Sequence, residues 1–149
     1  MGTNETTNKE RGDVFARRVG EYLSREGHTV QREYPVDVGL SSRHKKAHHF
    51  DYGNESLLVE CKFYDWTAGG NNPSAKISTL NEAMMFFHSA PTTHRKLVFI
   101  SKTKKNGVRQ PETFAEYYVR LNRHFIPDDV EVWEFDEGPL AARRISGES

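Results

Sequence analysis

An aspartate and a Glu-x-Lys triplet, separated by eight residues, are the part of this sequence best suited to chemistry. Asp51 comes first, and Glu60-Cys61-Lys62 follows directly after the apolar run 57–59. Residues two apart share a face of an extended strand, so Glu60 and Lys62 point to one side and Cys61 to the other. Burying a charged side chain beside core residues costs free energy unless the charge has a partner. The pattern therefore favours a functional site over an ordinary Glu–Lys pair on the surface.

The distance between Asp51 and Glu60 depends on the hairpin loop between their two strands. A four-residue loop at 54–57 places Asp51 opposite Glu60, with Cβ atoms about 5 Å apart. A two-residue turn at 53–54 instead leaves Glu60 about 13 Å from Asp51 along the strand. Only the four-residue loop brings both carboxylates to one ion, so a shared metal site requires that register.

In that register the oxygen atoms suit a hard divalent cation. Asp51, Glu60, the backbone carbonyl of Cys61 and waters form a shell typical of Mg²⁺ or Mn²⁺. Lys62 beside this shell could orient or deprotonate a water and offset the charge of a phosphate. Cys61 is the single cysteine, which excludes a disulfide framework and a multi-thiolate metal site.

Hydrophobic periodicity and turn signals predict the elements that must hold these residues. Thr7 and Glu10 have capping-box spacing and start a helix that Gly27 ends. The expected order is α-β-β-β-α-β-α-β, an α/β (α+β) fold with one mixed sheet flanked by helices. The remaining elements are strands at 29–38, 48–52 and 57–63, a helix opened by Asn72-Pro73-Ser74, a strand at 96–101, a helix from 111 and a strand at 130–135.

The length of 149 residues fits one domain, with 36 % hydrophobic and 11 % aromatic residues to form its core. We expect a flexible N-terminus at 1–8, the domain at 9–137 and a flexible tail at 138–149. No apolar run approaches the ~20 residues of a membrane span, and no signal peptide opens the chain. A soluble, cytoplasmic protein is expected.

The 21 basic and 21 acidic residues cancel, which excludes a uniformly basic nucleic-acid coat and a strongly acidic tail protein. The charges are nevertheless segregated. Residues 83–111 hold six basic and no acidic residues, 126–140 hold six acidic and no basic ones, and 43–49 form a further basic cluster with three histidines. This pattern indicates a positive and a negative face, or a set of solvated loops.

With this order of elements, Asp51-x(8)-Glu60-x-Lys62 resembles the PD-(D/E)XK nuclease superfamily, whose restriction-endonuclease-like fold has an αβββαβ core. The resemblance covers about residues 9–135. It implies that Asp51 and Glu60 bind a divalent metal and that Lys62 assists the water that attacks the phosphodiester. Phe50, rather than the proline of the motif's name, precedes Asp51.

Many members of that superfamily carry a further glutamate on the first helix. Ala16 occupies the position where we expect it, which leaves Glu10 and Glu21. Glu21, one turn beyond Arg17, is the candidate further metal ligand; a solvated glutamate is the alternative.

Several residues could contact a substrate. Helix N-termini attract phosphate, so Ser74 and Lys76 are candidates in the first turn of their helix. Basic side chains in loops would make salt-sensitive, sequence-independent contacts with the DNA backbone. These candidates are Lys45, Lys46, Lys102, Lys104 and Lys105. His44 and His48 are four apart, but their segment does not read as a helix, so a zinc site is disfavoured.

The resemblance therefore implies a Mg²⁺-dependent endodeoxyribonuclease of a restriction, defence or mobile-element type. A Holliday-junction or repair nuclease of the same fold and a non-catalytic DNA-binding module are the alternatives. Cutting both strands of a duplex with one small domain suggests paired sites, and the run 84–87 is apolar on more than one helix face. We therefore also expect a homodimer.

Overall fold

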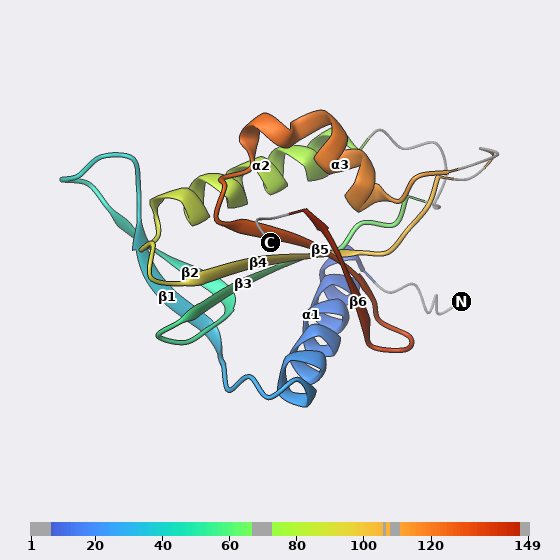
Figure 1. Ribbon diagram of the computed structural model, residues 1–149, viewed down its shortest axis with the longest axis horizontal. Coiled ribbons are helices and arrows are strands. Elements are labelled where there is room, and N and C mark those ends of the chain that lie inside the picture. The colour runs from blue at the N-terminus through green and yellow to red at the C-terminus, as the bar shows by residue number, and fades with distance from the viewer. Residues whose placement is uncertain (1–6, 67–72, 106, 108–110, 147–149) are drawn as a thin grey trace.

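The computed structural model of the chain describes residues 7–66, 73–105, 107 and 111–146. Six strands form one mixed sheet, with α1 on one face and α2 and α3 on the other (Figure 1). The elements are α1 (Asn8–Arg25), β1 (Gln31–Val38), β2 (Lys46–Gly53), β3 (Leu57–Lys62), α2 (Ser74–Ser89), β4 (Arg95–Ser101), α3 (Phe114–Asn122), the 3₁₀ turn η1 (Arg123–Phe125), β5 (Val130–Asp136) and β6 (Ala141–Ser146). The expected mixed α/β class and order of elements are confirmed, with β6 added.

Strand order in the sheet follows chain order from β1 to β6. The strands β1, β2 and β3 form an antiparallel meander, because short loops connect them. The strands β3, β4 and β5 run parallel, with α2 and α3 in the crossovers. The edge strand β6 returns antiparallel to β5.

The apolar side chains form one cluster on each face of the sheet. Under α1, Phe15, Val19 and Leu23 are buried against β3, β4 and β5. On the other face, Leu80, Met84 and Phe87 of α2 and Phe114 and Tyr118 of α3 are buried against the centre of the sheet. These two clusters hold the N-terminal turns of α1 and α2 on opposite sides of β3.

The predicted boundaries of the first helix are confirmed. The Thr7 hydroxyl accepts the backbone N–H of Glu10 at 3.1 Å, and the Glu10 carboxylate accepts the N–H of Thr7 at 3.3 Å. Gly27 follows the helix with φ 88°, a left-handed conformation that glycine adopts without steric cost. Thr7 and Asn8 therefore begin α1 rather than a flexible N-terminus, and 1–6 lie outside the described residues.

The sequence predicts a flexible tail from Gly138 onward. This prediction is wrong for the part up to Ser146, because a strand lies there. Residues 141–146 pair with β5 as β6, through contacts such as Phe135↔Ala142. Half of this strand is polar and it is partly exposed, so it lacks the hydrophobic alternation that reveals a strand in a sequence. Backbone pairing and the ion pair between Arg143 and Glu134, at 3.1 Å, hold it instead.

The basic and acidic segments of the sequence pair with one another in part, so neither of the two alternatives, separate charged faces or solvated loops, describes them fully. The reason is that β4 and β5 are neighbours in the sheet. Three ion pairs join them and their flanks: Arg95–Glu131 and Lys96–Asp129 at 2.8 Å, and Lys102–Asp136 at 3.8 Å.

The apolar run 84–87 offers no exposed side chain for a second copy of the chain. Met84 and Phe87 are buried in the core, and Met85 and Phe86 are half-buried. The run therefore gives no support to the expected dimer. Among the helices that the structure describes, none is both long and apolar enough to cross a membrane.

Candidate active site

The register of the β2–β3 hairpin places Asp51 opposite Glu60. The paired residues are Tyr52↔Val59 and Gly53↔Leu58, which is the register of the four-residue loop. Upstream of Tyr52, β2 continues its pairing with β1, while β3 continues along β4 to Lys62. The two strands therefore separate at Asp51, and this separation opens the sheet beside Glu60-Cys61-Lys62.

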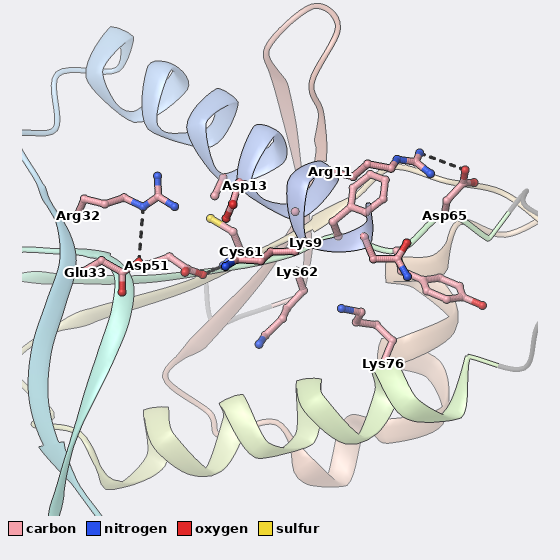
Figure 2. A pocket seen from close by; sticks show the side chains of 15 residues that line it. Lys9, Arg11, Asp13, Arg32, Glu33, Asp51, Cys61, Lys62, Asp65 and Lys76 are labelled. Carbon is pink, nitrogen blue, oxygen red and sulfur yellow. Dashed lines mark hydrogen bonds and ion pairs between the residues drawn. The ribbon is translucent and has the colours of Figure 1, made fainter. Parts of the chain in front are cut away.

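The side chain of Asp51 fills the gap where the ladder ends. Its Oδ2 atom accepts the backbone N–H of Cys61 at 2.7 Å, which replaces the carbonyl of a regular strand pair (Figure 2). Burial, and next the negative charge of Glu60, raise the pKa of Asp51 to about 6, although the Cys61 hydrogen bond and Lys62 oppose the shift. A cation beside these carboxylates would remove much of this repulsion.

The carboxylate of Glu60 is buried, with 5 % of its side chain exposed. Its Oε1 atom lies 3.0 Å from Nε2 of His48, and its Oε2 atom lies 3.6 Å from Nζ of Lys62. The contact of Glu60 with Lys62 agrees with the expectation that the two side chains share one face of the strand. His48, placed by the sequence in a basic cluster, was not foreseen as a partner of Glu60.

A pocket of about 410 Å³ lies beside Asp51, Cys61 and Lys62. Its walls come from the first turns of α1, the start of β1, Asp51 of β2, the end of β3 and the start of α2 (Figure 2). The charged residues in the wall are Lys9, Arg11, Asp13, Arg32, Glu33, Asp51, Lys62, Asp65 and Lys76. Glu60 does not line the pocket itself, but the next two residues of β3, Cys61 and Lys62, do.

Two lysines lie near each other at this pocket. Lys76, in the first turn of α2, points toward Lys62 of β3 (Figure 2). Burial, and next the positive charge of Lys62, lower the pKa of Lys76 below its ordinary value. Two like charges in one hollow are stabilised by a bound anion, so this wall suits a phosphate group.

The carboxylate that α1 contributes to the pocket is Asp13, not Glu21 or Glu10. Glu21 is exposed, pairs with Arg18 at 2.7 Å and does not line the pocket. Glu10 is engaged in the capping box at the helix start. The sequence offered one signal for Asp13, since it lies three residues before Ala16 and therefore on the same face of the helix.

A third carboxylate of the wall, Glu33, has an unusual backbone. It lies in β1 between the pairs Arg32↔Tyr52 and Tyr34↔Phe50, and therefore opposite Asp51. Its φ is 57°, in the left-handed region that costs a non-glycine residue about 1–2 kcal/mol. This conformation breaks the alternation of the strand, and both Arg32 and Glu33 line the pocket. No sequence pattern identifies such a position.

The predicted substrate contacts are dispersed. Lys102 and Lys104 line a second pocket of about 390 Å³ that shares Arg11 and Asp65 with the first one. Lys105 is exposed and lines neither pocket.

Ser74 is the exposed first residue of α2 and does not line either pocket. Lys45 and Lys46 are exposed at the far end of the β1–β2 hairpin, and the Lys45 ammonium donates to the carbonyl of Gly39. Lys46 is five residues from Asp51, roughly 16 Å along the strand. Lys76 is thus the predicted contact nearest the carboxylates, and the hairpin lysines are remote from them.

Asp51 and Glu60 are ligand types that a magnesium ion accepts. Within the described ranges, no three or more His, Cys, Asp or Glu side chains are grouped closely enough to hold a metal. Mg²⁺ commonly uses only one or two carboxylates and keeps several waters, so the number of carboxylates at Asp51 and Glu60 does not exclude it. The Cys61 carbonyl leaves β3 on the same edge as the N–H bound to Asp51, and it could supply a further oxygen.

Comparisons with protein-family models, with curated proteins and with solved structures find no match to this chain. The arguments for a function therefore come from the residues and their arrangement.

Proposed function

We propose that this protein is a metal-dependent endonuclease of the PD-(D/E)XK type that hydrolyses phosphodiester bonds in DNA. The observation that carries the proposal is the position of Asp51 opposite Glu60 at the separation of two strands, with Lys62 3.6 Å from Glu60. The order of elements and the mixed sheet agree with the αβββαβ core that the sequence resemblance implies.

Each residue of the cluster has its own role in the proposed reaction. Asp51 and Glu60, with the Cys61 carbonyl, would hold Mg²⁺ or Mn²⁺, and a bound ion of this kind acts as a Lewis acid and lowers the pKa of its water. Lys62 lies beside Glu60 and orients the attacking water. Lys76 faces Lys62 across the pocket and neutralises the phosphate charge that grows during the reaction.

The surrounding cations favour a polyanionic substrate. Lys102 and Lys104 line the adjoining pocket, and Lys45 and Lys46 form a separate exposed pair at the far end of the hairpin. Such contacts with phosphate position DNA without reading its sequence. We favour restriction or mobile-element cleavage, with junction resolution or repair as the alternative; plasmid duplex and four-way junction substrates distinguish the two.

We also propose that the protein works as a homodimer, because one cluster of Asp51, Glu60 and Lys62 acts on one strand at a time. Sedimentation of the full chain, with and without duplex DNA, tests this proposal. A monomer that nicks only one strand would contradict it.

A non-catalytic DNA-binding module is the second candidate, and one observation favours it. Both carboxylate oxygens of Glu60 already have a partner in the protein itself, Oε1 the His48 ring and Oε2 the Lys62 ammonium. A side chain satisfied in this way needs no metal. The basic side chains would then serve binding alone.

Plasmid digestion with Mg²⁺ or Mn²⁺ separates the two candidates. We expect the wild-type protein to cut, and Asp51→Ala and Lys62→Ala each to reduce the rate at least about 100-fold, because each removes a group that holds the metal or orients the water. Asp37→Ala, which removes an exposed carboxylate of β1, is the matched control and should cut normally.

Equal cutting by all four proteins would overturn the assignment of the site. No cutting of duplex, single-stranded or junction substrates with either metal, together with retained DNA binding, would favour the binding module.

A further inference from the structure

We infer that His48 is the positioning residue of the site: it holds Glu60 in the orientation that presents one oxygen to a divalent cation. This inference rests on the proposed function, because it takes Glu60 as a metal ligand. The histidine belongs to β2, on the part of the strand that has already separated from β3. It therefore reaches Glu60 through its side chain rather than through strand pairing.

The hydrogen bond between the two side chains has a defined direction. Nε2 of His48 lies 3.0 Å from Oε1 of Glu60. An ionised carboxylate only accepts hydrogen bonds, so Nε2 must carry the proton and donate it. The bond lies in a mostly buried setting, with 23 % of the His48 side chain and 5 % of the Glu60 side chain exposed.

Two aromatic contacts fix the plane of the His48 ring. Phe86 of α2 stacks on it, with the ring centroids 4.1 Å apart and the planes at 24°. Phe50 of β2 meets it edge to face, with centroids 4.6 Å apart and planes at 89°. The donor atom is thus held by the packing of α2 on the sheet, and the ring has little freedom to turn away from Glu60.

The two carboxylate oxygens of Glu60 therefore have different partners. His48 fixes Oε1, and Oε2 faces Lys62 at 3.6 Å. A buried carboxylate with a fixed oxygen keeps one rotamer, which reduces the conformational cost of binding an ion. Residues that orient metal ligands in this way typically contribute about 10- to 100-fold in metal affinity or activity.

Direct binding of Mn²⁺ to the full chain, measured by calorimetry without DNA, tests the inference. His48→Phe keeps an aromatic ring but removes the donor, and we expect it to weaken Mn²⁺ binding about 10- to 100-fold. His48→Gln restores an N–H donor and should recover most of the affinity. His49→Gln, at the exposed neighbouring position, is the control and should bind as the wild type does.

A second readout uses cleavage at increasing Mg²⁺. For His48→Phe, we expect the Mg²⁺ concentration for half-maximal rate to rise while the maximal rate stays within a few-fold of wild type. If His48→Phe does not fold, Phe86→Leu tests the same positioning of Glu60 by His48, because it removes the stacked ring and leaves the hydrogen bond. We expect that variant to weaken Mn²⁺ binding several-fold.

Glu60→Gln separates failure of this inference from failure of the proposed function. If Glu60→Gln weakens Mn²⁺ binding but His48→Phe or Phe86→Leu binds like the wild type, the positioning role of His48 is overturned and the metal site stands. If the wild type does not bind Mn²⁺, or Glu60→Gln binds it equally well, Glu60 is not a ligand and both proposals fail.

Discussion

The surroundings of Asp51 in the folded protein disfavour its ionised carboxylate. Burial, and next the charge of Glu60, raise its pKa from 3.8 to about 6, and the hydrogen bond from Cys61 offsets only part of that shift. In the metal-free protein, folding therefore favours the protonated form. The associated stability is present below the unfolded pKa near 3.8 and is lost as the pH rises through about 6.

The residue-scale prediction is that Asp51→Asn stabilises the metal-free protein at pH 8. The asparagine keeps an oxygen for the Cys61 N–H and removes the buried charge, so we expect a gain in unfolding free energy of up to about 3 kcal/mol. The gain should shrink as the pH falls through 6 and be absent below pH 4. Urea unfolding in EDTA at several pH values measures it.

Asp37→Asn, on the exposed side of β1, is the control and should show no such pH dependence. An Asp51→Asn protein no more stable than the wild type at pH 8 would show that the Asp51 carboxylate is not under strain.

At the scale of elements, β6 is held to the sheet by a charged contact. The Glu134 side chain is 3 % exposed, and Arg143 of β6 lies 3.1 Å from one of its oxygens. Arg143 also reaches Glu116 of α3, at 3.4 Å. The strand thus covers an acidic side chain that would otherwise be buried without a counter-charge.

We predict that Arg143→Ala lowers the unfolding free energy by about 1–3 kcal/mol, because it leaves the buried Glu134 without its donor. Adding Glu134→Gln should recover part of the loss, since a neutral amide is cheaper to bury unpaired. Urea unfolding at pH 7 measures both, with Arg123→Ala on η1 as an exposed control. A loss of stability in the double variant equal to the sum of the two single losses would contradict the pairing.

At the scale of the whole molecule, the zero net charge has a structural meaning. The acidic β5 lies beside the basic β4, so much of the charge is neutralised inside the sheet and at its ends. The cations that remain for an anionic partner include Lys76 of the pocket, Lys104 of the adjoining pocket, and Lys45 and Lys46 of the hairpin. DNA affinity should therefore depend on few contacts.

We predict a shallow salt dependence of duplex binding. Two to four phosphate contacts correspond to a slope of about −2 to −4 in a plot of log affinity against log salt concentration. Lys45→Ala with Lys46→Ala should reduce the steepness by about 2, because each lysine neutralises about one phosphate. Fluorescence anisotropy of a labelled duplex without Mg²⁺ measures the slope.

Arg123→Ala removes one exposed positive charge outside both pockets and should leave the slope unchanged. An unchanged slope in the Lys45 and Lys46 double variant would place the DNA elsewhere on the molecule.

The sequence by itself determined the features that depend on neighbouring residues. Thr7 and Glu10 predicted the start of α1, because a capping box is closed within four residues. The hairpin sequence left two loop lengths open, and a shared metal site required the one that places Asp51 opposite Glu60, because register follows from turn geometry. Both are local interactions, and each is present in the structure.

Only the tertiary structure decided what surrounds those two carboxylates. The contact of His48 with Glu60 requires β2 to separate from β3 while α2 packs its Phe86 on the ring. Asp13 enters the pocket because α1 lies across the sheet, and the charges cancel because β4 and β5 are neighbours. Such contacts depend on strand order, separation and helix packing, which join residues far apart in the chain and leave no periodic pattern within it.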